Sequence, residues 1–276
     1  MAQFLSLHEA VARYVQDGAT VAMEGFTHLI PFAAGHEVIR QGKNDLTLIR
    51  MTPDLIYDQL IGAGCVKKVI FSWGGNPGVG SLHRLRDAVE NGWPRPLEIL
   101  EHSHAAMACA FEAGAAGLPM AVLRGYIGSE LPSVNSQIRF IECPFTGERL
   151  AAVPSVRPDT SIVHAQKADR EGNVLIEGIV GVQKEAILAA QQSIVTVEEI
   201  VDELDTHPNA CVIPAWAINA VAVAEKGALP SYTHGYYERD NSSYKKWDGI
   251  ARDRETFTRW LNDHVLSSTA GAGGQG

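Results

Sequence analysis

The sequence predicts an α/β fold: a largely parallel, open sheet with helices on both faces, forming three layers. Short apolar runs alternate along the chain with segments of helical periodicity, and an unbroken apolar run is typical of a strand buried on both faces of a parallel sheet. Hydrophobic residues make up 46% and charged residues 20% of the 276 residues, which is the ordinary composition of a globular protein with a core. No break in composition marks a linker, so we expect one domain over residues 1–266 and a disordered tail over residues 267–276.

The order of elements follows from caps and periodicity. Ser6 and Glu9 have the spacing of a capping box that begins a helix, and Asp17-Gly18 ends it. Residues 125–160 are rich in Pro, Ser and Gly and indicate a looser stretch. The predicted strands cover residues 20–23, 46–51, 66–73, 97–100, 161–166, 174–177 and 194–197, and the predicted later helices cover residues 32–41, 54–61, 81–90, 105–115 and 183–191.

Charge and cysteine content exclude several classes of function. Lys and Arg number 23 against 32 Asp and Glu, a net charge of -9, so phosphate backbones and anionic lipids are repelled and neither nucleic acid nor membrane is an expected partner. The start of the chain lacks the basic and apolar segments of a signal peptide. We therefore expect a cytoplasmic protein with no metal and no permanently bound cofactor. The cysteines have no CxxC spacing and are expected to be reduced, mostly buried thiols: Cys65, Cys109, Cys143 and Cys211.

In open α/β sheets, ligands bind beyond the carboxyl ends of the strands, and the first candidate site there is the segment Glu24-Gly25-Phe26-Thr27. A glycine lets the backbone approach a ligand, and exposed amides can hold an oxyanion. The alternative is an ordinary turn after a strand, with Phe26 packed inside.

The second candidate is the glycine-rich segment over residues 74–81, which contains Asn76 and Gly78. Its spacing matches neither the dinucleotide-binding nor the P-loop signature. It could hold a phosphate or carboxylate at a helix N-terminus, or be a flexible loop before a capping Ser81.

The third candidate is Glu101-His102-Ser103-His104, at the end of a predicted strand. If the strand continues, Glu101 and Ser103 face one side while His102 and His104 face the other. A metal site lacks an evident third ligand, whereas His104 or Glu101 could transfer protons. Alternatively, these polar residues simply cap helix 105–115.

A fourth polar segment, from His164 through Asp169 to Gly172-Asn173, predicts a tight turn between neighbouring strands. We expect Asp169 and Asn173 to bond the turn backbone, which is a structural role.

Taken together, these segments resemble the family I coenzyme A transferases, in detail the α (A) subunits of the glutaconate type. The resemblance covers roughly residues 5–262 and is carried by many short matches in the same order. They include Gly25-Phe26-Thr27 with Pro31, residues 60–64, Gly117-Leu118-Pro119, Pro144-Phe145, Gly172-Asn173 and residues 235–240.

The resemblance implies ping-pong transfer of CoA from an acyl-CoA to a free carboxylic acid, both small molecules. The nucleophile is a glutamate of a separate β subunit, so a heterodimer or heterotetramer is expected. Glu90-Asn91-Gly92 resembles the nucleophile motif of β subunits, but Gly92 there is a helix stop. The site residues expected in this chain are Glu24, Glu101 and His104 as catalytic groups, and Gly25, Phe26, Thr27, Asn76, Gly78 and Ser103 for binding substrate and CoA.

Two departures from the family leave alternatives open. First, Glu24 stands where the family has a glycine, and the loop between Phe26 and Pro31 is one residue shorter. Second, Glu101 and His104 occupy positions where α subunits usually show less acid/base potential. Relatives with this fold act as CoA-thioester ring-opening hydrolases or decarboxylases, so a second hypothesis uses His104, Glu101 or Glu24 as acid or base. A third is a non-catalytic sensor of an acyl-CoA or a sugar phosphate, since fold does not fix function.

Overall fold

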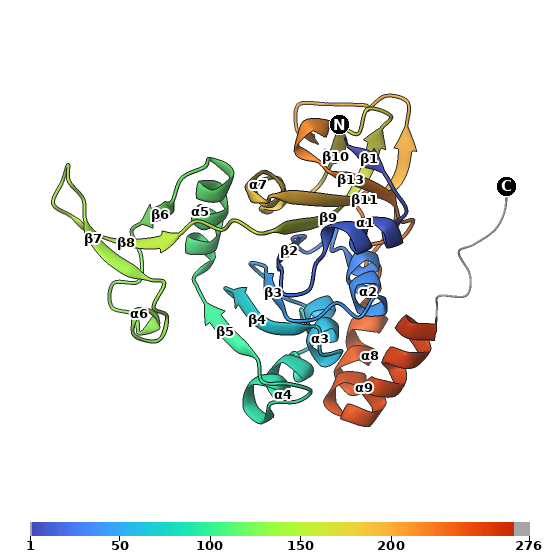
Figure 1. Ribbon diagram of the computed structural model, residues 1–276, viewed down its shortest axis with the longest axis horizontal. Helices are drawn as coiled ribbons and strands as arrows, with labels where there is room; N and C mark the ends of the chain where they lie inside the picture. The colour runs from blue at the N-terminus through green and yellow to red at the C-terminus, as the bar shows by residue number, and fades with distance from the viewer. Residues whose placement is uncertain (1, 268–276) are drawn as a thin grey trace.

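The computed structural model describes residues 2–267 and contains one large, mostly parallel sheet (Figure 1). Its strand order is β1-β13-β11-β9-β2-β3-β4-β5, with β10 paired to β9 and β12 to β10. Every pair along the main order is parallel, and the pairs that involve β10 are antiparallel. The strands are β1 (Gln3–Phe4), β2 (Thr20–Glu24), β3 (Leu46–Ile49), β4 (Val66–Phe71), β5 (Glu98–Glu101), β9 (Thr160–Asp169), β10 (Val174–Ile176), β11 (Gln192–Val201), β12 (Cys211–Ile213) and β13 (Ala220–Val223).

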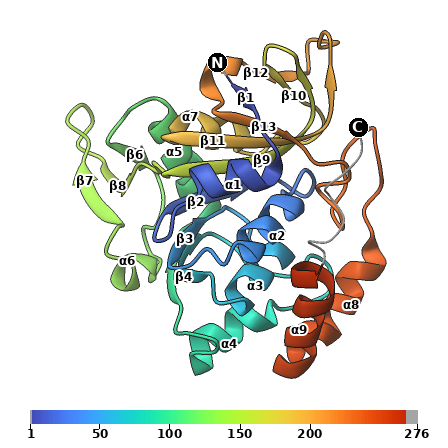
Figure 2. The same ribbon diagram turned by 45° about the vertical axis from the view of Figure 1, so that its right-hand side comes forward.

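Helices cover both faces of this sheet (Figure 2). In β2, Val21 and Met23 pack into one hydrophobic cluster with α1, α2 and α3, whereas Ala22 between them packs into a second cluster with α5 and α7. Both faces are therefore buried, which confirms the predicted fold class. The helices are α1 (Leu7–Tyr14), α2 (Phe32–Arg40), α3 (Leu55–Gly62), α4 (His83–Asn91), α5 (His104–Ala115), α6 (Leu131–Val134), α7 (Gln183–Ala189), α8 (Asn241–Arg252) and α9 (Arg254–Leu261), with a 3₁₀ turn at Ala215–Ala217 and a π-helical turn at Asn262–Leu266.

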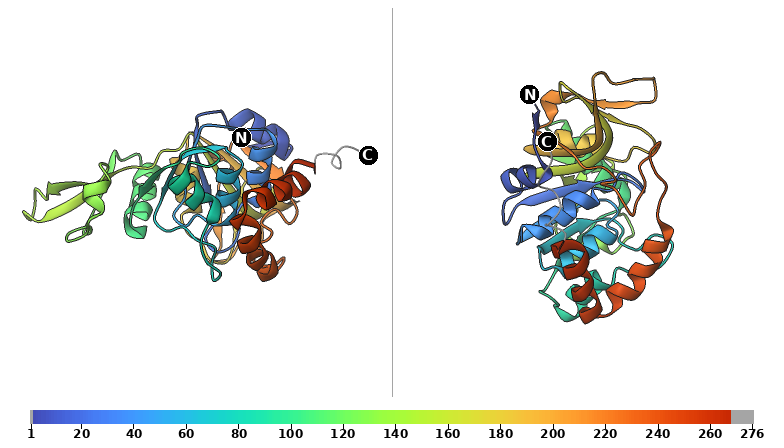
Figure 3. Two further views of the ribbon diagram at one scale, coloured as in Figure 1. Left: turned by 90° about the horizontal axis from the view of Figure 1, so that it is seen from below. Right: turned by 90° about the vertical axis from the view of Figure 1, so that its right-hand side faces the viewer.

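The predicted loose stretch over residues 125–160 is wrong in part, because it holds most of a second, antiparallel sheet of order β6-β8-β7. The chain leaves the main body after α5 and returns through β8 into β9, so this sheet projects to one side (Figures 1 and 3). The Pro, Ser and Gly residues of its turns obscured the sequence pattern of the strands, and the strands are also partly exposed. The strands are β6 (Met120–Leu123), β7 (Arg139–Glu142) and β8 (Arg149–Pro154).

Two helices that the sequence patterns did not predict, α8 and α9, complete the layer of α1 to α3. Trp247 and Phe257 lie buried in the same cluster as α2 and α3, and the two rings meet edge to face with centroids 5.9 Å apart. The end of the chain thus returns to the sheet and places the residues before α8 near the carboxyl ends of the strands (Figure 2).

Local predictions have mixed outcomes. The capping box of Ser6 and Glu9 is confirmed. Helix α4 begins at His83 with Leu82 as its N-cap, so Ser81 is not the cap. All four cysteines are free thiols, but only Cys65 is buried. The tail expected at residues 267–276 lies, except for Ser267, outside the described residues. Among residues 2–267, no helix has the length and apolar character needed to cross a bilayer.

Candidate functional site

The loops that follow β2, β3 and β4 surround a cavity of about 150 Å³ at the carboxyl ends of these strands. The chain before and within α8 closes its remaining side, which sequence reasoning did not anticipate. The lining residues are Phe26, Thr27 and Ile30 after β2, Arg50, Thr52 and Asp54 after β3, Trp73 and Pro77 after β4, and Arg239 and Tyr244 near α8.

The loop after β2 is tight and held in a strained conformation. A Cβ on Gly25 would lie 2.5 Å from the Leu29 carbonyl oxygen, so only glycine fits. Thr27 and Leu29 have φ angles of 63° and 53°, a left-handed conformation that costs a non-glycine residue about 1–3 kcal/mol. The Leu29 amide donates to Tyr232 O at 2.9 Å, and Ser231 Oγ donates to Thr27 O at 3.1 Å. Strained residues that are held in place by several surrounding contacts are typical of functional loops.

The amides of Phe26 and Thr27 are available to a ligand, because no hydrogen bond from either is found within the described residues. Phe26 is half-buried beside Gly181, where an added Cβ would lie 2.7 Å from the Phe26 Cβ. The loop therefore combines a half-buried aromatic ring with two amides that lack a partner among the described residues, and its role in holding an oxyanion stays a prediction.

Glu24 is buried below this loop, with 2% of its surface exposed. Its carboxylate accepts a hydrogen bond of 3.0 Å from the Met51 amide, and it does not line the cavity. Burial raises the pKa of Glu24 to about 7, opposed in part by the charge of Arg50.

Two guanidinium groups and one carboxyl group line the cavity. Arg50, 1% exposed, donates to Asp54 Oδ1 at 3.0 Å and to Gly25 O at 2.7 Å. Arg239 donates to Pro77 O at 3.0 Å, and its guanidinium carbon lies 3.9 Å from the centroid of the Tyr244 ring. Burial raises the pKa of Asp54, against the charge of Arg50.

Several polar atoms of this set have no partner among the described residues: Nε of Arg50, Nε of Arg239 and Oδ2 of Asp54. Unsatisfied buried donors cost about 1–3 kcal/mol each. All three atoms belong to residues that line the cavity.

Asn76 and Gly78 belong to a tight turn and not to an anion cradle at the start of α4. The Asn76 amide donates to Gly80 O at 2.8 Å, and Gly78 has φ of 78°. The Asn76 side chain donates to Tyr244 O at 2.8 Å. Asn76 thus holds one wall of the cavity without lining it.

Glu101, Ser103 and His104 lie at the sheet edge, outside the lining of the cavity. The expected alternation of faces is wrong beyond Glu101, because β5 ends there and His104 begins α5. Ser103 Oγ accepts from the Ala106 amide at 3.2 Å, which confirms the capping alternative. Glu101 and His104 are exposed.

His102 is the buried member of that segment. Its ring lies 3.4 Å from the Tyr126 hydroxyl and 3.2 Å from Asn135 Nδ2, and burial lowers its pKa. These contacts tie the end of β5 to the segment between β6 and β7 of the antiparallel sheet, which is a structural role.

The turn after β9 is confirmed, since Asp169 Oδ1 accepts from the amides of Glu171 and Asn173 at 3.0 and 2.9 Å.

No local pattern predicted the buried network that begins at His164. His164 Nε2 lies 2.8 Å from Glu198 Oε1, which also accepts from the Tyr237 hydroxyl at 2.6 Å. This network fixes the segment that carries Arg239.

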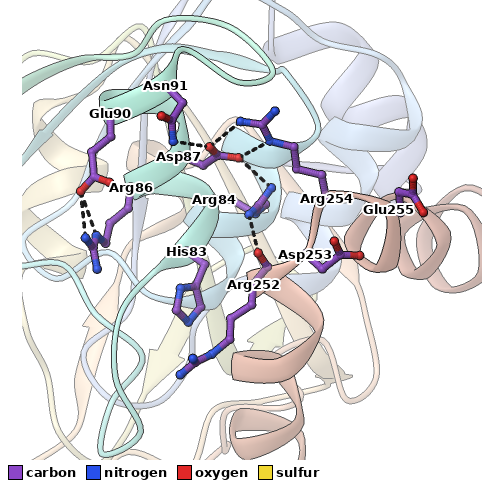
Figure 4. Close-up of a pocket in the computed structure, with 10 residues that line it drawn as sticks. All are labelled: His83, Arg84, Arg86, Asp87, Glu90, Asn91, Arg252, Asp253, Arg254 and Glu255. Carbon is purple, nitrogen blue, oxygen red and sulfur yellow. Dashed lines mark hydrogen bonds and ion pairs between the residues drawn. The ribbon is translucent and has the colours of Figure 1, made fainter.

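A second, larger hollow of about 560 Å³ lies on the surface between α4 and the start of α9. Figure 4 shows that its charges pair with one another: Arg254 and Arg84 with Asp87, and Arg86 with Glu90. Gly92 has φ of 68° and ends α4, so Glu90 occupies a helix end as expected. We call this hollow the charged groove. Among residues 2–267, no group of three or more His, Cys, Asp or Glu side chains is placed to hold a metal ion.

Comparison with known proteins finds similar sequences and a similar fold. The family model for "Coenzyme A transferase" matches residues 4–224. The chain is 69% identical over 265 residues to the α (A) subunit of the "3-oxoadipate CoA-transferase" of Pseudomonas knackmussii, covering 96% of this chain and 94% of that protein.

It is also 33% identical over 286 residues to the α (A) subunit of the "Glutaconate CoA-transferase" of Acidaminococcus fermentans, covering 96% of this chain and 88% of that protein. The crystal structure of glutaconate coenzyme A-transferase from the same organism superposes with a TM-score of 0.91 at 31% identity, over 97% of this chain and 90% of that one.

Proposed function

Because this chain belongs to the coenzyme A transferase family and has the sequence of an α (A) subunit, we propose that it forms part of a cytoplasmic enzyme that moves CoA from an acyl-CoA to 3-oxoadipate. The observation that carries this proposal is the 69% identity over 96% of the chain to the α (A) subunit of an enzyme of that name. The cavity supports it, since its two guanidinium groups suit the second carboxylate of a dicarboxylic acid.

In the proposed reaction, a β-subunit glutamate attacks the acyl-CoA thioester, giving a mixed anhydride and CoA thiolate. The thiolate then attacks the glutamyl carbonyl, which releases the first acid and leaves a glutamyl-CoA thioester. The acceptor carboxylate repeats the two steps in reverse and leaves as its CoA thioester.

Each attack develops negative charge on a carbonyl oxygen. The free amides of Phe26 and Thr27 are the groups of this chain that suit that oxygen. Gly25 keeps the loop in the required path, because any larger residue would displace it.

The second hypothesis, a CoA-thioester hydrolase, ring-opening hydrolase or decarboxylase, has less support. Glu101 and His104 are exposed and do not line the cavity, and the carboxyl group of Glu24 is engaged by the Met51 amide. Their catalytic roles stay predictions.

The test uses this chain in complex with its β subunit. Acetyl-CoA and succinyl-CoA are each incubated with heavy-oxygen-labelled 3-oxoadipate, and all CoA species and acids are identified by mass spectrometry. We expect 3-oxoadipyl-CoA only when 3-oxoadipate is added, and heavy oxygen in the released donor acid after several turnovers. Oxygen from water in that acid, with free CoA and no acceptor needed, would instead establish hydrolysis. Tight binding of an acyl-CoA without any turnover would establish a sensor.

A further inference from the structure

We propose that the cavity at the ends of β2, β3 and β4 holds the acceptor carboxylate that does not react, and that Arg239 is the residue that selects dicarboxylic over monocarboxylic acids. The inference rests on the proposed function and deepens it, since it assigns the substrate's far end to particular side chains.

The cavity has the size of the expected fragment. Its volume of about 150 Å³ corresponds to roughly five atoms at the ~30 Å³ that one water occupies in the liquid. Beyond its keto group, 3-oxoadipate has two methylenes and a carboxylate, which are five non-hydrogen atoms.

The walls divide in the way such a fragment requires. Phe26, Ile30 and Trp73 supply apolar surface for the methylenes. At the polar side, Arg50 and Arg239 line the cavity. A carboxylate there would pair with both guanidinium groups, and hydrogen bonds between a guanidinium and a carboxylate are about twice as strong as neutral ones.

The charges at the cavity are unbalanced without a ligand. Two guanidinium groups face the single lining carboxyl group of Asp54. Glu24, behind Arg50, adds at most part of a charge at neutral pH. One bound carboxylate brings the cavity close to neutrality, which favours an acid with a second carboxylate over one that ends in a methyl group.

The two arginines have different duties. Arg50 is fixed by Asp54 and by Gly25 O, so its loss would disturb the strained loop as well as the cavity. The Arg239 side chain makes one hydrogen bond among the described residues, to Pro77 O, and is half-buried over Tyr244. Arg239 can therefore be changed with less effect on the fold, which makes it the residue to test.

The experiment compares two acceptors of equal chain length, 3-oxoadipate and 3-oxohexanoate, which ends in a methyl group. Wild-type, Arg239→Met and Arg239→Lys chains are each prepared in complex with the β subunit. In Arg239→Met we expect kcat/KM to fall by about a hundredfold or more for 3-oxoadipate, because a buried carboxylate loses its charged partner. For 3-oxohexanoate it should stay within roughly threefold, and Arg239→Lys should lie between.

The matched control is Arg254→Met, which removes an arginine bonded to Asp87 in the charged groove. It should leave the ratio of the two kcat/KM values unchanged. If Arg239→Met lowers kcat/KM equally for both acceptors, or lowers it for neither, the subsite is overturned while the proposed function stands.

Other outcomes separate the two proposals. A wild type that uses 3-oxohexanoate as well as 3-oxoadipate overturns the subsite alone. If the wild type rejects 3-oxoadipate but prefers glutarate to pentanoate, the proposed acceptor is overturned and the subsite is supported. If CoA is transferred to no dicarboxylate, both the proposed acceptor and the subsite are overturned. If Arg239→Met fails to assemble, Arg239→Lys and the wild-type preference decide.

Discussion

The cavity and the charged groove both gather arginines and acids, yet they differ in how those charges are used. The groove is the larger, with about 560 Å³ against about 150 Å³. Its lining holds four arginines and four acidic residues, so it is neutral without a ligand. The cavity has two arginines and one acidic residue among its lining and is not neutral.

An orphan donor alone does not distinguish the two regions, because Nε of Arg84 in the groove also lacks a partner among the described residues. The Arg84 guanidinium is satisfied otherwise, by Asp87 and by the face of Trp93 at 4.9 Å. What distinguishes the cavity is unbalanced charge beside a strained loop. If the cavity is the binding site that we propose, uncompensated charge is a better guide to such a site than size or the number of charges.

The largest expected effect is a loss of kcat when a glycine at the cavity, but not one beside the charged groove, is replaced by alanine. Gly25→Ala places a Cβ 2.5 Å from Leu29 O and 2.9 Å from Ile30 Cα, both backbone atoms. The loop must shift, and a displacement of about 1 Å at a reacting centre can cost a hundredfold in rate. We expect at least that loss of kcat in the complex with the β subunit, measured by the formation of 3-oxoadipyl-CoA.

Gly249→Ala, in α8 beside the groove, is the matched control. A Cβ there meets nothing within 4 Å, and alanine is favoured over glycine inside a helix by about 1 kcal/mol. The variant should keep wild-type kcat and unfold at a higher urea concentration. Equal kcat for the two variants would show that the loop geometry is not needed.

The sequence predicts those features of the fold and of the candidate site that depend on a local pattern of residues. Gly25 and its strand were predictable, because an apolar run followed by a glycine is a local pattern. Arg50 and Arg239 were missed as a pair, since they are 189 positions apart in the sequence and meet only because α8 returns to the sheet.

Glu101 and His104 were singled out for their chemistry alone. Whether β5 lies in the centre or at the edge of the sheet depends on topology, which no pattern within that segment encodes. The contact between His164 and Glu198 could not be predicted from the sequence either, because β9 and β11 pair residues that are 32 positions apart.

The second prediction concerns Glu24. Its folded pKa of about 7 exceeds the ordinary value of 4.5, so the native state holds a proton that the unfolded state releases. This contribution lowers the free energy of unfolding as pH rises from about 4.5 to 7, by about 3 kcal/mol in all. Glu24→Gln should lack this component, which urea unfolding at about pH 5 and pH 8 measures.

Ionisation of Glu24 also sharpens the comparison, because it brings a second negative charge beside Arg50. The groups that face Glu24 are Arg50, the amides of Met51 and Gly25, and Tyr57. Above pH 7 the cavity approaches the neutrality of the groove, so KM for 3-oxoadipate should rise in the wild type and stay level in Glu24→Gln. The control Glu90→Gln, at an exposed ion pair with Arg86, should behave as the wild type. The same pH dependence in Glu24→Gln and the wild type would remove Glu24 from this account.

The smallest effect is expected from Asp87 in the groove, and it is one of stability alone. Hydrogen bonds from Arg254, followed by Asn91 and Arg84, lower the pKa of Asp87 to about 2 against the opposing effect of burial. The folded pKa is depressed, so the stabilisation is complete above the ordinary value of 3.8 and is lost as pH falls through 2. Asp87→Asn should therefore lower the free energy of unfolding at neutral pH by about 2 kcal/mol, and the deficit should vanish in acid. The ratio of kcat/KM for 3-oxoadipate and 3-oxohexanoate should not change, because Asp87 does not line the cavity. A changed ratio in a stably folded Asp87→Asn complex would make the groove a binding region too, and uncompensated charge would no longer separate the two hollows.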